Sequence, residues 1–360
     1  MATIEPYDTQ AGRRWRVRYR RPDRRQTDKR GFKTKRDAQA FAATVETSKL
    51  RGAYVNPSDG RITVGELGEA WLARQTHVKP STLRRNTIAW QQQVRPEFGA
   101  LPVSQVTHSH IRAWLSDLTA SMSASSVRIA FGVLRGILSD AEKDKLIASA
   151  PISGHRLPKK AARRKKFLTH VDVEAIAREA KYPTLVRLLA YTGLRWGEAA
   201  GLTVGDLNFL RRRINIERSA TRVGSRVEVG PVKTWESRTV PMPPFLVDDL
   251  ARQCEDKQAD DLLFSEQGRH LTSTTAVDTD GWLTTACRRA GVERVTPHDL
   301  RHTAASLAVQ AGAHVKVLQR MLGHSSAAVT LDTYSMLFDD DLDSVAGALS
   351  DARDAQLRQS

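Results

Sequence analysis

Cysteine is scarce in this sequence, and long apolar runs are missing. Cys254 and Cys287 are its two cysteines among 360 residues, so it has neither a disulfide framework nor a cysteine-based metal cluster. A reducing compartment, the cytoplasm, is expected. No stretch approaches the roughly 18 to 20 apolar residues of a transmembrane helix, and the opening MATIEPYDTQ lacks a signal-peptide core. We expect a soluble intracellular protein with no membrane partner.

Acidic residues are also few compared with basic ones. The chain has 40 Asp and Glu against 56 Lys and Arg, a net charge of +16. Residues 1–60 hold 15 Lys and Arg against 7 Asp and Glu, and residues 155–166 hold seven against none. These two segments carry nearly all of the excess, which is typical of a protein that binds a polyanion. Nucleic acid is the predicted partner, and binding should weaken steeply with salt.

The N-terminal segment predicts a small sheet followed by a helix. In RRWRVRYR, residues 13–20, basic and apolar side chains alternate, so one face of a strand is apolar and the other basic. A second strand to Phe32 and a helix capped by Thr34 and continuing to Arg51 should follow. If the sheet lies in a DNA groove, Arg16, Arg18 and Arg20 are the candidate contacts. The alternative is a sheet whose exposed face is basic without binding DNA.

The next segment reads as a helical bundle that ends near Ala150. Capping residues start four helices with apolar faces, at Thr63, Ser81, Thr107 and Ser123. Its tryptophans are expected in the core, and nothing in it predicts chemistry. The basic run HRLPKKAARRKK then joins the bundle to the rest of the chain.

The C-terminal half should be mainly helical with one small antiparallel sheet. Thr169 opens a helix, and a second helix over residues 184–192 ends at Gly193. Arg195 then lies on a turn, where its charge is held in place, with Glu198 three residues on to orient it. The segments LRRRINIERS, SRVEVGPVK and SRTVPMP form the sheet, with Lys233 between its last two strands.

The stretch from Thr296 to Tyr334 carries the residue types that phosphodiester chemistry needs. His298 and Arg301 share a helical face, and Tyr334 follows His324 by ten residues. Arginine gives planar donors to two phosphate oxygens, histidine moves protons near neutral pH, and tyrosine can act as a nucleophile. Taken alone, each residue has an ordinary structural interpretation as an ion-pairing, capping or core side chain.

The ordered set of motifs resembles the tyrosine recombinases, the phage integrase family. YTGLRWGEAAGL, PHDLRHTAAS, LGHSS and LDTYS are similar to that family's signature boxes, and VKTWESRTVPMP lies between the first two. The resemblance covers most of the C-terminal half, and it implies that Tyr334 attacks DNA to form a 3′-phosphotyrosyl link without a metal ion, another cofactor or ATP. The implied catalytic residues are Arg195, Lys233, His298, Arg301, His324 and Tyr334, with Glu198 supporting Arg195.

The resemblance also implies an architecture of several domains. These are an α+β arm-type DNA-binding domain at 1–60, an all-α core-site-binding domain (SAM-like) at 61–150, a basic linker at 151–166, and a mainly α catalytic domain at 167–360. Further candidate DNA contacts are Lys79, Ser81, Thr82, Arg84 and Arg85 in the bundle and Lys159, Lys160, Arg163 and Arg164 in the linker. The implied partners are double-stranded DNA with core-type and arm-type attachment sites, further subunits of a homotetramer on which the C-terminal helix docks, a host DNA-bending protein and an excisionase.

Other proteins with related features stay as alternatives. A Xer-like recombinase shares the last two domains and usually lacks the first, and a conjugative-transposon recombinase shares the chemistry. A type IB topoisomerase shares the tyrosine but acts as a monomer on one duplex. A DNA-binding regulator needs the basic segments but not Tyr334.

Overall fold

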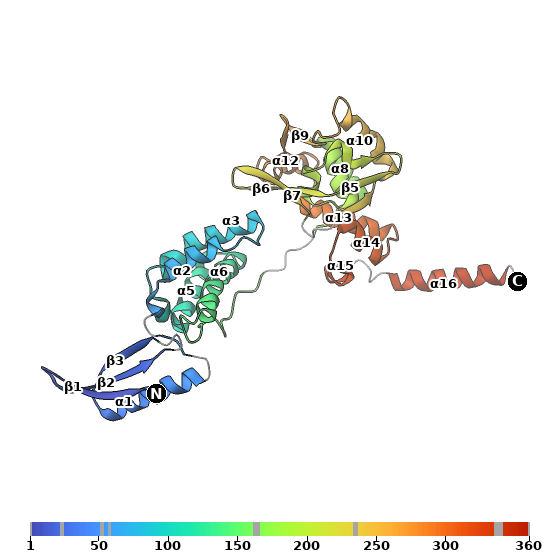
Figure 1. The fold of residues 1–360 in the computed structure, drawn as a ribbon. Coiled ribbons are helices and arrows are strands. Elements are labelled where there is room, and N and C mark those ends of the chain that lie inside the picture. The colour runs from blue at the N-terminus through green and yellow to red at the C-terminus, as the bar shows by residue number, and fades with distance from the viewer. Residues whose placement is uncertain are drawn as a thin grey trace. The chain divides into compact units, whose positions relative to one another are not determined.

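The computed structural model describes residues 2–21, 25–50, 54–56, 59–160, 166–232, 237–334 and 341–358. The chain divides into two compact units, Met1–Ala162 and Arg163–Ser360 (Figure 1). The fold is mostly helical with small antiparallel sheets, as predicted. No described helix is long and apolar enough to span a bilayer. The domain boundaries at residues 60, 150 and 166 stay predictions.

An antiparallel sheet with strand order β1-β2-β3 opens the first unit. Its strands are β1 (Thr3–Thr9), β2 (Gly12–Arg20) and β3 (Gln26–Phe32), and helix α1 (Lys35–Leu50) packs against it. The apolar side chains Val17 and Tyr19 of β2 are buried against α1, which confirms the alternation predicted for this strand. The Thr34 hydroxyl accepts a hydrogen bond from the Asp37 amide at 3.1 Å, which confirms the predicted cap.

The helical bundle has its own hydrophobic core. Its helices are α2 (Val64–Ala73), α3 (Pro80–Ala89), the π-helical turn η2 (Trp90–Val94), α4 (Arg95–Phe98), α5 (His108–Ser121) and α6 (Ala124–Lys143). The caps predicted at Thr63, Thr107 and Ser123 are confirmed. The cap predicted at Ser81 was two residues late, because Lys79 is the N-cap and Pro80 takes the first helical position, where its missing N–H costs nothing.

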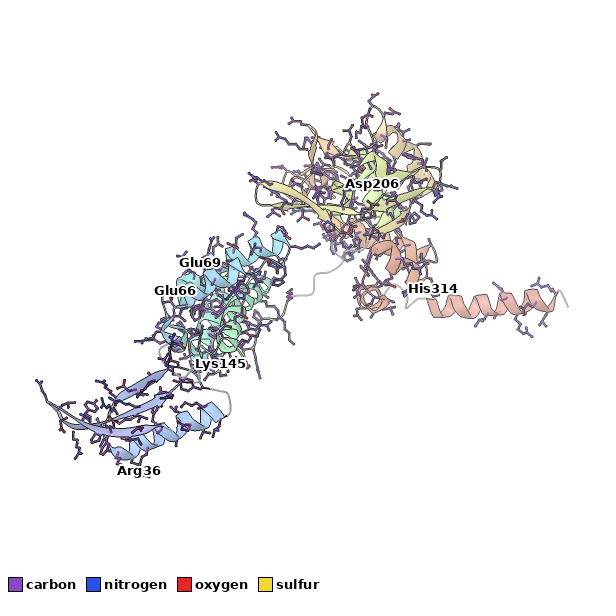
Figure 2. The ribbon with its side chains drawn as sticks, viewed as in Figure 1. Arg36, Glu66, Glu69, Lys145, Asp206 and His314 are labelled. Carbon is purple, nitrogen blue, oxygen red and sulfur yellow. The ribbon has the colours of Figure 1, made fainter. Side chains whose placement is uncertain are left out.

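Two acidic side chains fix helix α2 in the bundle, and Figure 2 labels both. Glu66 accepts from the Thr63 amide at 2.9 Å and completes a capping box. Glu69 accepts from the indole nitrogen of Trp90 at 3.0 Å, so the buried tryptophan keeps its donor satisfied. Trp71 and Trp114 are buried too, which confirms that the bundle tryptophans are core residues.

The second unit is built mostly from helices. They are α7 (His170–Glu179), α8 (Pro183–Thr192), α9 (Trp196–Ala200), α10 (Val247–Cys254), α11 (Ser273–Val277), α12 (Trp282–Arg289), α13 (Pro297–Gln310), α14 (Val315–Leu322), α15 (Ala327–Tyr334) and α16 (Asp341–Leu357). Short 3-10 turns are η1 (Asp59–Arg61) and η3 (Val103–Gln105) in the first unit and η4 (Val204–Asp206) and η5 (Pro244–Leu246) in the second. The helix start predicted at Thr169 is confirmed, and Thr169 forms a capping box with Asp172 there.

The prediction that the strands of the catalytic half form a single sheet was wrong. Its strands form a three-stranded sheet of order β4-β5-β8 and a separate hairpin of β6 and β7, and β9 and β10 pair elsewhere. The strands are β4 (Leu207–Asn208), β5 (Arg213–Ile216), β6 (Arg218–Val223), β7 (Arg226–Pro231), β8 (Arg238–Pro241), β9 (Ser265–Glu266) and β10 (Arg269–His270). Strand β5 pairs with β8 through Ile214 and Val240, and both side chains are fully buried. The β6–β7 hairpin, which lies between these strands in the sequence, is more exposed.

Helix α8 lies in the core of this unit, and α13 packs directly beside it. Leu188 and Leu189 of α8 are fully buried, as is Leu300 of α13. A second small cluster joins α13, α14 and α15 and contains Leu318, Leu322 and Tyr334. These contacts place the ends of α8, α14 and α15 near one another, where the candidate residues lie.

Candidate active site

Helix α13 carries two of the candidate residues, His298 and Arg301, on its first turns. A capping box joins Thr296 and the buried Asp299, with the Thr296 amide donating to Asp299 Oδ2 at 2.8 Å. The following residues point inward, so Arg301 and His302 are buried. His298, nearer the start, is exposed, and its ring contacts that of His302 edge to face at 4.5 Å.

Arg301 is 3% exposed and joins two helix ends. Its guanidinium donates to the carbonyl oxygen of Gly193 after α8 and, at 2.6 Å, to that of Leu322 at the end of α14. Gly193 has a φ of +67°, and a Cβ there would lie 2.6 Å from a Leu322 methyl group, so glycine is required. Burial lowers the pKa of the Arg301 guanidinium to about 9, and the charge of Arg195 adds to this effect.

Arg195 is the N-cap residue of α9 and is held by Glu198. The Arg195 amide donates to Glu198 Oε2 and its Nη1 to Glu198 Oε1, both at 2.8 Å. Its Nη2 donates to the carbonyl oxygen of Gly323 at 2.9 Å. Glu198 is 1% exposed, so it is a buried partner of Arg195 rather than a solvent-exposed acid on the helix surface, and its role in orienting Arg195 stays a prediction.

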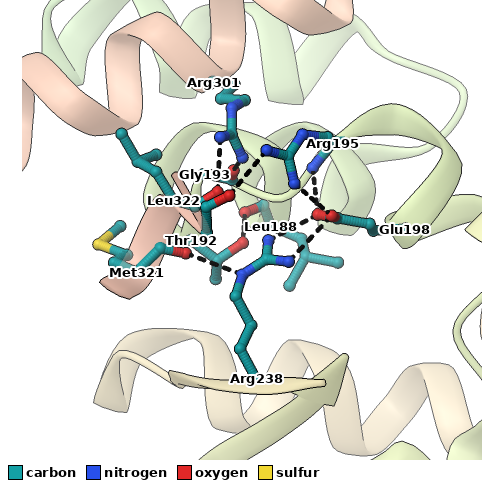
Figure 3. A network of polar contacts seen from close by, with 10 residues as sticks. Leu188, Thr192, Gly193, Arg195, Glu198, Arg238, Arg301, Met321 and Leu322 are labelled. Atoms are coloured by element: carbon teal, nitrogen blue, oxygen red, sulfur yellow. Dashed lines mark hydrogen bonds and ion pairs between the residues drawn. The ribbon is translucent and has the colours of Figure 1, made fainter. Parts of the chain in front are cut away.

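A third arginine, Arg238 at the start of β8, completes the cluster shown in Figure 3. Its Nη1 and Nη2 donate to the two oxygens of Glu198 at 2.9 and 2.6 Å, and its Nε donates to the Met321 carbonyl oxygen at 3.2 Å. Burial would raise the pKa of Glu198, but the hydrogen bonds and charge of Arg238 outweigh it and, with Arg195, lower that pKa to about 2. The carboxylate is therefore ionised at neutral pH, and the cluster keeps an excess of positive charge.

A hollow of about 290 Å³ opens beside one of these arginines, Arg238. Arg238, Gly323 and His324 are among the residues that line it. Permanently charged donors next to a hollow form a site suited to an anion. Among the described residues, no group of three or more His, Cys, Asp or Glu side chains is placed to hold a metal ion.

Tyr334 lies at the end of α15 and is 1% exposed. Its hydroxyl shares a hydrogen bond of 2.8 Å with His302 Nδ1, in which the donor depends on the histidine tautomer. The His324 ring lies parallel to the Tyr334 ring with centroids 6.2 Å apart, and His324 Nδ1 contacts the Thr330 hydroxyl at 3.0 Å. Burial raises the pKa of the Tyr334 hydroxyl, and the charge of Arg301 offsets part of that rise.

The protonation of His324 is set by the same cluster. Burial and the positive charges of Arg301 and Arg195 lower the pKa of His324 to about 4. The imidazole is therefore neutral at pH 7 and presents one N–H donor and one acceptor. An anion bound at the arginines would raise this pKa by offsetting their charge.

Comparison with known protein families gives an ordered set of matches. An arm DNA-binding domain matches residues 7–49, the N-terminal SAM-like domain of phage integrases matches 63–119, and the phage integrase family matches 166–340. The integrase of Mycobacterium phage L5 is 27% identical over 85% of this chain and 96% of its own. The tyrosine recombinase XerD of Corynebacterium glutamicum is 30% identical over 63% of this chain and 78% of its own.

The chain belongs to the phage integrase family of tyrosine recombinases. Membership of this family identifies it as a site-specific DNA recombinase. The fold of this integrase also matches the crystal structure of a lambda integrase tetramer bound to a Holliday junction. That match has a TM-score of 0.60 at 18% identity and covers 89% of this chain and 96% of the other.

The integrase structure brings together Arg195, Glu198, Arg301, His324 and Tyr334, and their roles in catalysis stay predictions. His298 is exposed, and its ring contacts the ring of His302, which belongs to the same site. Lys233 lies outside the described residues, so its place in the site stays a prediction.

Two residues of the site, His302 and Arg238, were not predicted from the sequence. His302 directly follows Arg301 in PHDLRHTAAS, but only His298 and Arg301 were predicted as site residues from this motif. The alternation in β8 was a usable signal for Arg238, because a period of two places it on the same face as the buried Val240.

The candidate DNA contacts of the integrase are distributed over three elements. Arg20 on β2 is exposed, and so are Arg84 and Arg85 on α3 and Lys159 and Lys160 in the linker. Ser81 is exposed too, and Lys79 and Thr82 are half-buried. Arg16 and Arg18 on β2 both bind Glu5, at 2.6 and 3.4 Å, so the face predicted to be wholly basic contains an acid from the strand that was not predicted. Arg163 and Arg164 lie outside the described residues.

Proposed function

We propose that Tyr334 cuts one DNA strand by attacking a phosphodiester bound at Arg195 and Arg301. The observation that supports this best is the adjacency of Arg301 and His302 on α13. Arg301 faces the two helix ends of the arginine cluster, while His302 holds the Tyr334 hydroxyl. One helical turn would therefore align the phosphate with the nucleophile, in the manner of other preorganised active sites.

The reaction would be phosphoryl transfer without a metal ion or ATP. The Tyr334 O–H bond breaks, its oxygen bonds to phosphorus, and the bond from phosphorus to the 5′ oxygen of the next nucleotide breaks. Arg195 and Arg301 would bind the non-bridging oxygens and stabilise the charge that develops on them. His324 would donate a hydrogen bond to the phosphate, and Lys233 would protonate the departing 5′ oxygen.

The tyrosine proton needs an acceptor, because burial raises the pKa of the Tyr334 hydroxyl. His302 Nδ1 lies within hydrogen-bond distance and would take the proton. His298, whose ring contacts His302, would assist by stabilising the imidazolium that forms. The resulting 3′-phosphotyrosyl bond keeps the energy of the phosphodiester, so the 5′ hydroxyl of another strand can reverse the step and exchange strands.

The substrate would be double-stranded DNA carrying core-type sites, bound by the bundle and the catalytic domain, and arm-type sites, bound by the N-terminal sheet. The exposed cations of β2, α3 and the linker support this assignment. Because lambda integrase has been seen as a tetramer on a Holliday junction, we also propose a tetramer as the synaptic form. A host DNA-bending protein and an excisionase would complete the complex, in the cytoplasm of a bacterial host.

A covalent trap tests this function directly. Purified protein is incubated with a pool of nicked duplexes of randomised sequence, in buffer with EDTA, and protein–DNA adducts are isolated under denaturing conditions. The wild-type protein should yield adducts whose DNA converges on one sequence after repeated selection, whereas Tyr334→Phe should yield none. Equal adduct formation by Tyr334→Phe, or none by the wild type after selection, would contradict the proposal.

A further inference from the structure

Three consecutive carbonyl groups at the end of α14 each bind a different arginine. The carbonyl of Met321 accepts from Arg238, that of Leu322 from Arg301, and that of Gly323 from Arg195. The last carbonyls of a helix have no partner within it, and the negative end of the helix dipole attracts cations. The end of α14 is therefore the common support of all three guanidinium groups.

Arg238 differs from the other two in how its donors are used. A guanidinium has five N–H groups. Within the described part of the chain, Arg195 and Arg301 each place two side-chain donors on protein oxygens, whereas Arg238 places three. Arg195 and Arg301 thus keep more donors for an anion, while Arg238 is committed to the protein.

We infer that Arg238 is a positioning residue that sets the orientation of Arg195 for the scissile phosphate. This inference rests on the function proposed above. Arg238 acts through Glu198, because it occupies both oxygens of the carboxylate that also holds the Arg195 amide and Nη1. Without Arg238, Glu198 would be available to bind the Arg195 guanidinium through both oxygens, and such a fork-to-fork pair would turn donors away from the phosphate.

The second route of positioning runs through Gly323. A Cβ at Gly323 would lie 2.9 Å from both Cδ and Nε of Arg238, so the arginine packs directly on this left-handed residue, whose φ is +62°. The carbonyl of the same glycine accepts from Arg195, and His324 follows it in the chain. Arg238 therefore fixes the turn that supports Arg195 from one side while Glu198 holds it from the other.

The test uses the DNA sequence selected with the wild-type protein and single-turnover adduct formation. Arg238→Gln should cleave roughly 10- to 100-fold more slowly than the wild type, a smaller loss than the roughly 100- to 1000-fold caused by removing an aligned donor, because Arg195 itself remains. Arg187→Gln is the matched control, because Arg187 binds Glu174 and Asp249 in the same unit, away from the arginine cluster. It should cleave within about threefold of the wild-type rate, as expected of a partly exposed ion pair.

Two further measurements separate positioning from a general structural effect. In an Arg195→Ala background, Arg238→Gln should change the rate by less than about threefold, because residues that act through one another are not additive. A neutral methylphosphonate at the scissile position removes the charge that Arg195 offsets, so on this substrate Arg238→Gln should cleave within about threefold of the wild-type rate. A defect in folding would persist on both substrates and in both backgrounds.

If Arg238→Gln fails to fold by circular dichroism and thermal unfolding, Arg238→Lys carries the test, because lysine keeps the charge but cannot bind both oxygens of Glu198 as a planar fork. Arg238→Lys should cleave the phosphodiester more slowly than the wild type, and it should cleave the methylphosphonate at a rate close to that of the wild type. A folded Arg238 variant that cleaves at the wild-type rate, or that multiplies the Arg195→Ala defect in full, would overturn the inference. A wild-type protein that forms no adduct would instead overturn the proposed function.

Discussion

Glu198→Gln tests whether one buried carboxylate holds the arginine cluster together. The substitution keeps the shape of the side chain but removes the charge that pairs with Arg195 and Arg238. The folded protein lowers the pKa of Glu198 from 4.5 to about 2. At about 1.4 kcal/mol per pKa unit, the ionised carboxylate contributes about 3 kcal/mol to the free energy of unfolding. Removing one partner of a buried ion pair costs a similar amount.

The stabilisation by the ionised Glu198 carboxylate depends on pH. Because the folded-state pKa is lowered, the stabilisation is complete above pH 4.5 and is lost as the pH falls towards 2. The stability difference between wild type and Glu198→Gln should therefore be largest near pH 7 and fall by about half between pH 5 and pH 3. Urea unfolding measures it, with hydrogen exchange of α8 and α13 assigning the transition to the catalytic unit.

Glu174→Gln is the control, since its pair with Arg187 is 41% exposed on the glutamate side and should contribute about 1 kcal/mol or less. A loss below about 1 kcal/mol for Glu198→Gln at pH 7, or a loss that stays constant down to pH 3, would refute the assignment of this carboxylate.

Three more substitutions probe the same region. His302→Asn should fold normally but form adduct at least about tenfold more slowly, measured in single turnover from pH 6 to 9, because the Tyr334 proton loses its acceptor. The pKa of His324 falls from 6.5 to about 4 in the folded protein, so the unfolded state binds the proton more readily. The free energy of unfolding should therefore decline as the pH drops from 6.5 to 4. In His324→Gln, urea unfolding at pH 7 and pH 5 should not show this decline. Gly323→Ala forces an alanine to a φ of +62° against Arg238, and it should lower the midpoint of thermal unfolding and slow cleavage together.

Local signals in the sequence were enough to predict many of the elements. Capping residues such as Thr63, Thr107 and Thr169 mark helix starts by satisfying amides within the next turn, so no distant contact is needed. Strand β2 was likewise visible from its alternation. Strand β1 was missed, because Pro6 and mixed polarity in TIEPYDT hide a strand that forms only by pairing with β2.

The active site was predictable only in part for a related reason. Arg301 and Tyr334 belong to motifs that the family resemblance marks, and the structure brings them into one small region. Arg238 lies in the segment VKTWESRTVPMP between the first two boxes, but the resemblance assigns it no role, and its partners Glu198 and Met321 lie far from it in the chain. Contacts of this range depend on how α9, α14 and β8 pack, which local sequence patterns do not encode.

The most direct measurement of the central claim is mass spectrometry of the trapped adduct. After digestion with nuclease and protease, we expect a nucleotide joined through its 3′ phosphate to the peptide that contains Tyr334. A nucleotide on any other residue, or a link through a 5′ phosphate, would contradict Tyr334 as the nucleophile and the arginine cluster as the phosphate site.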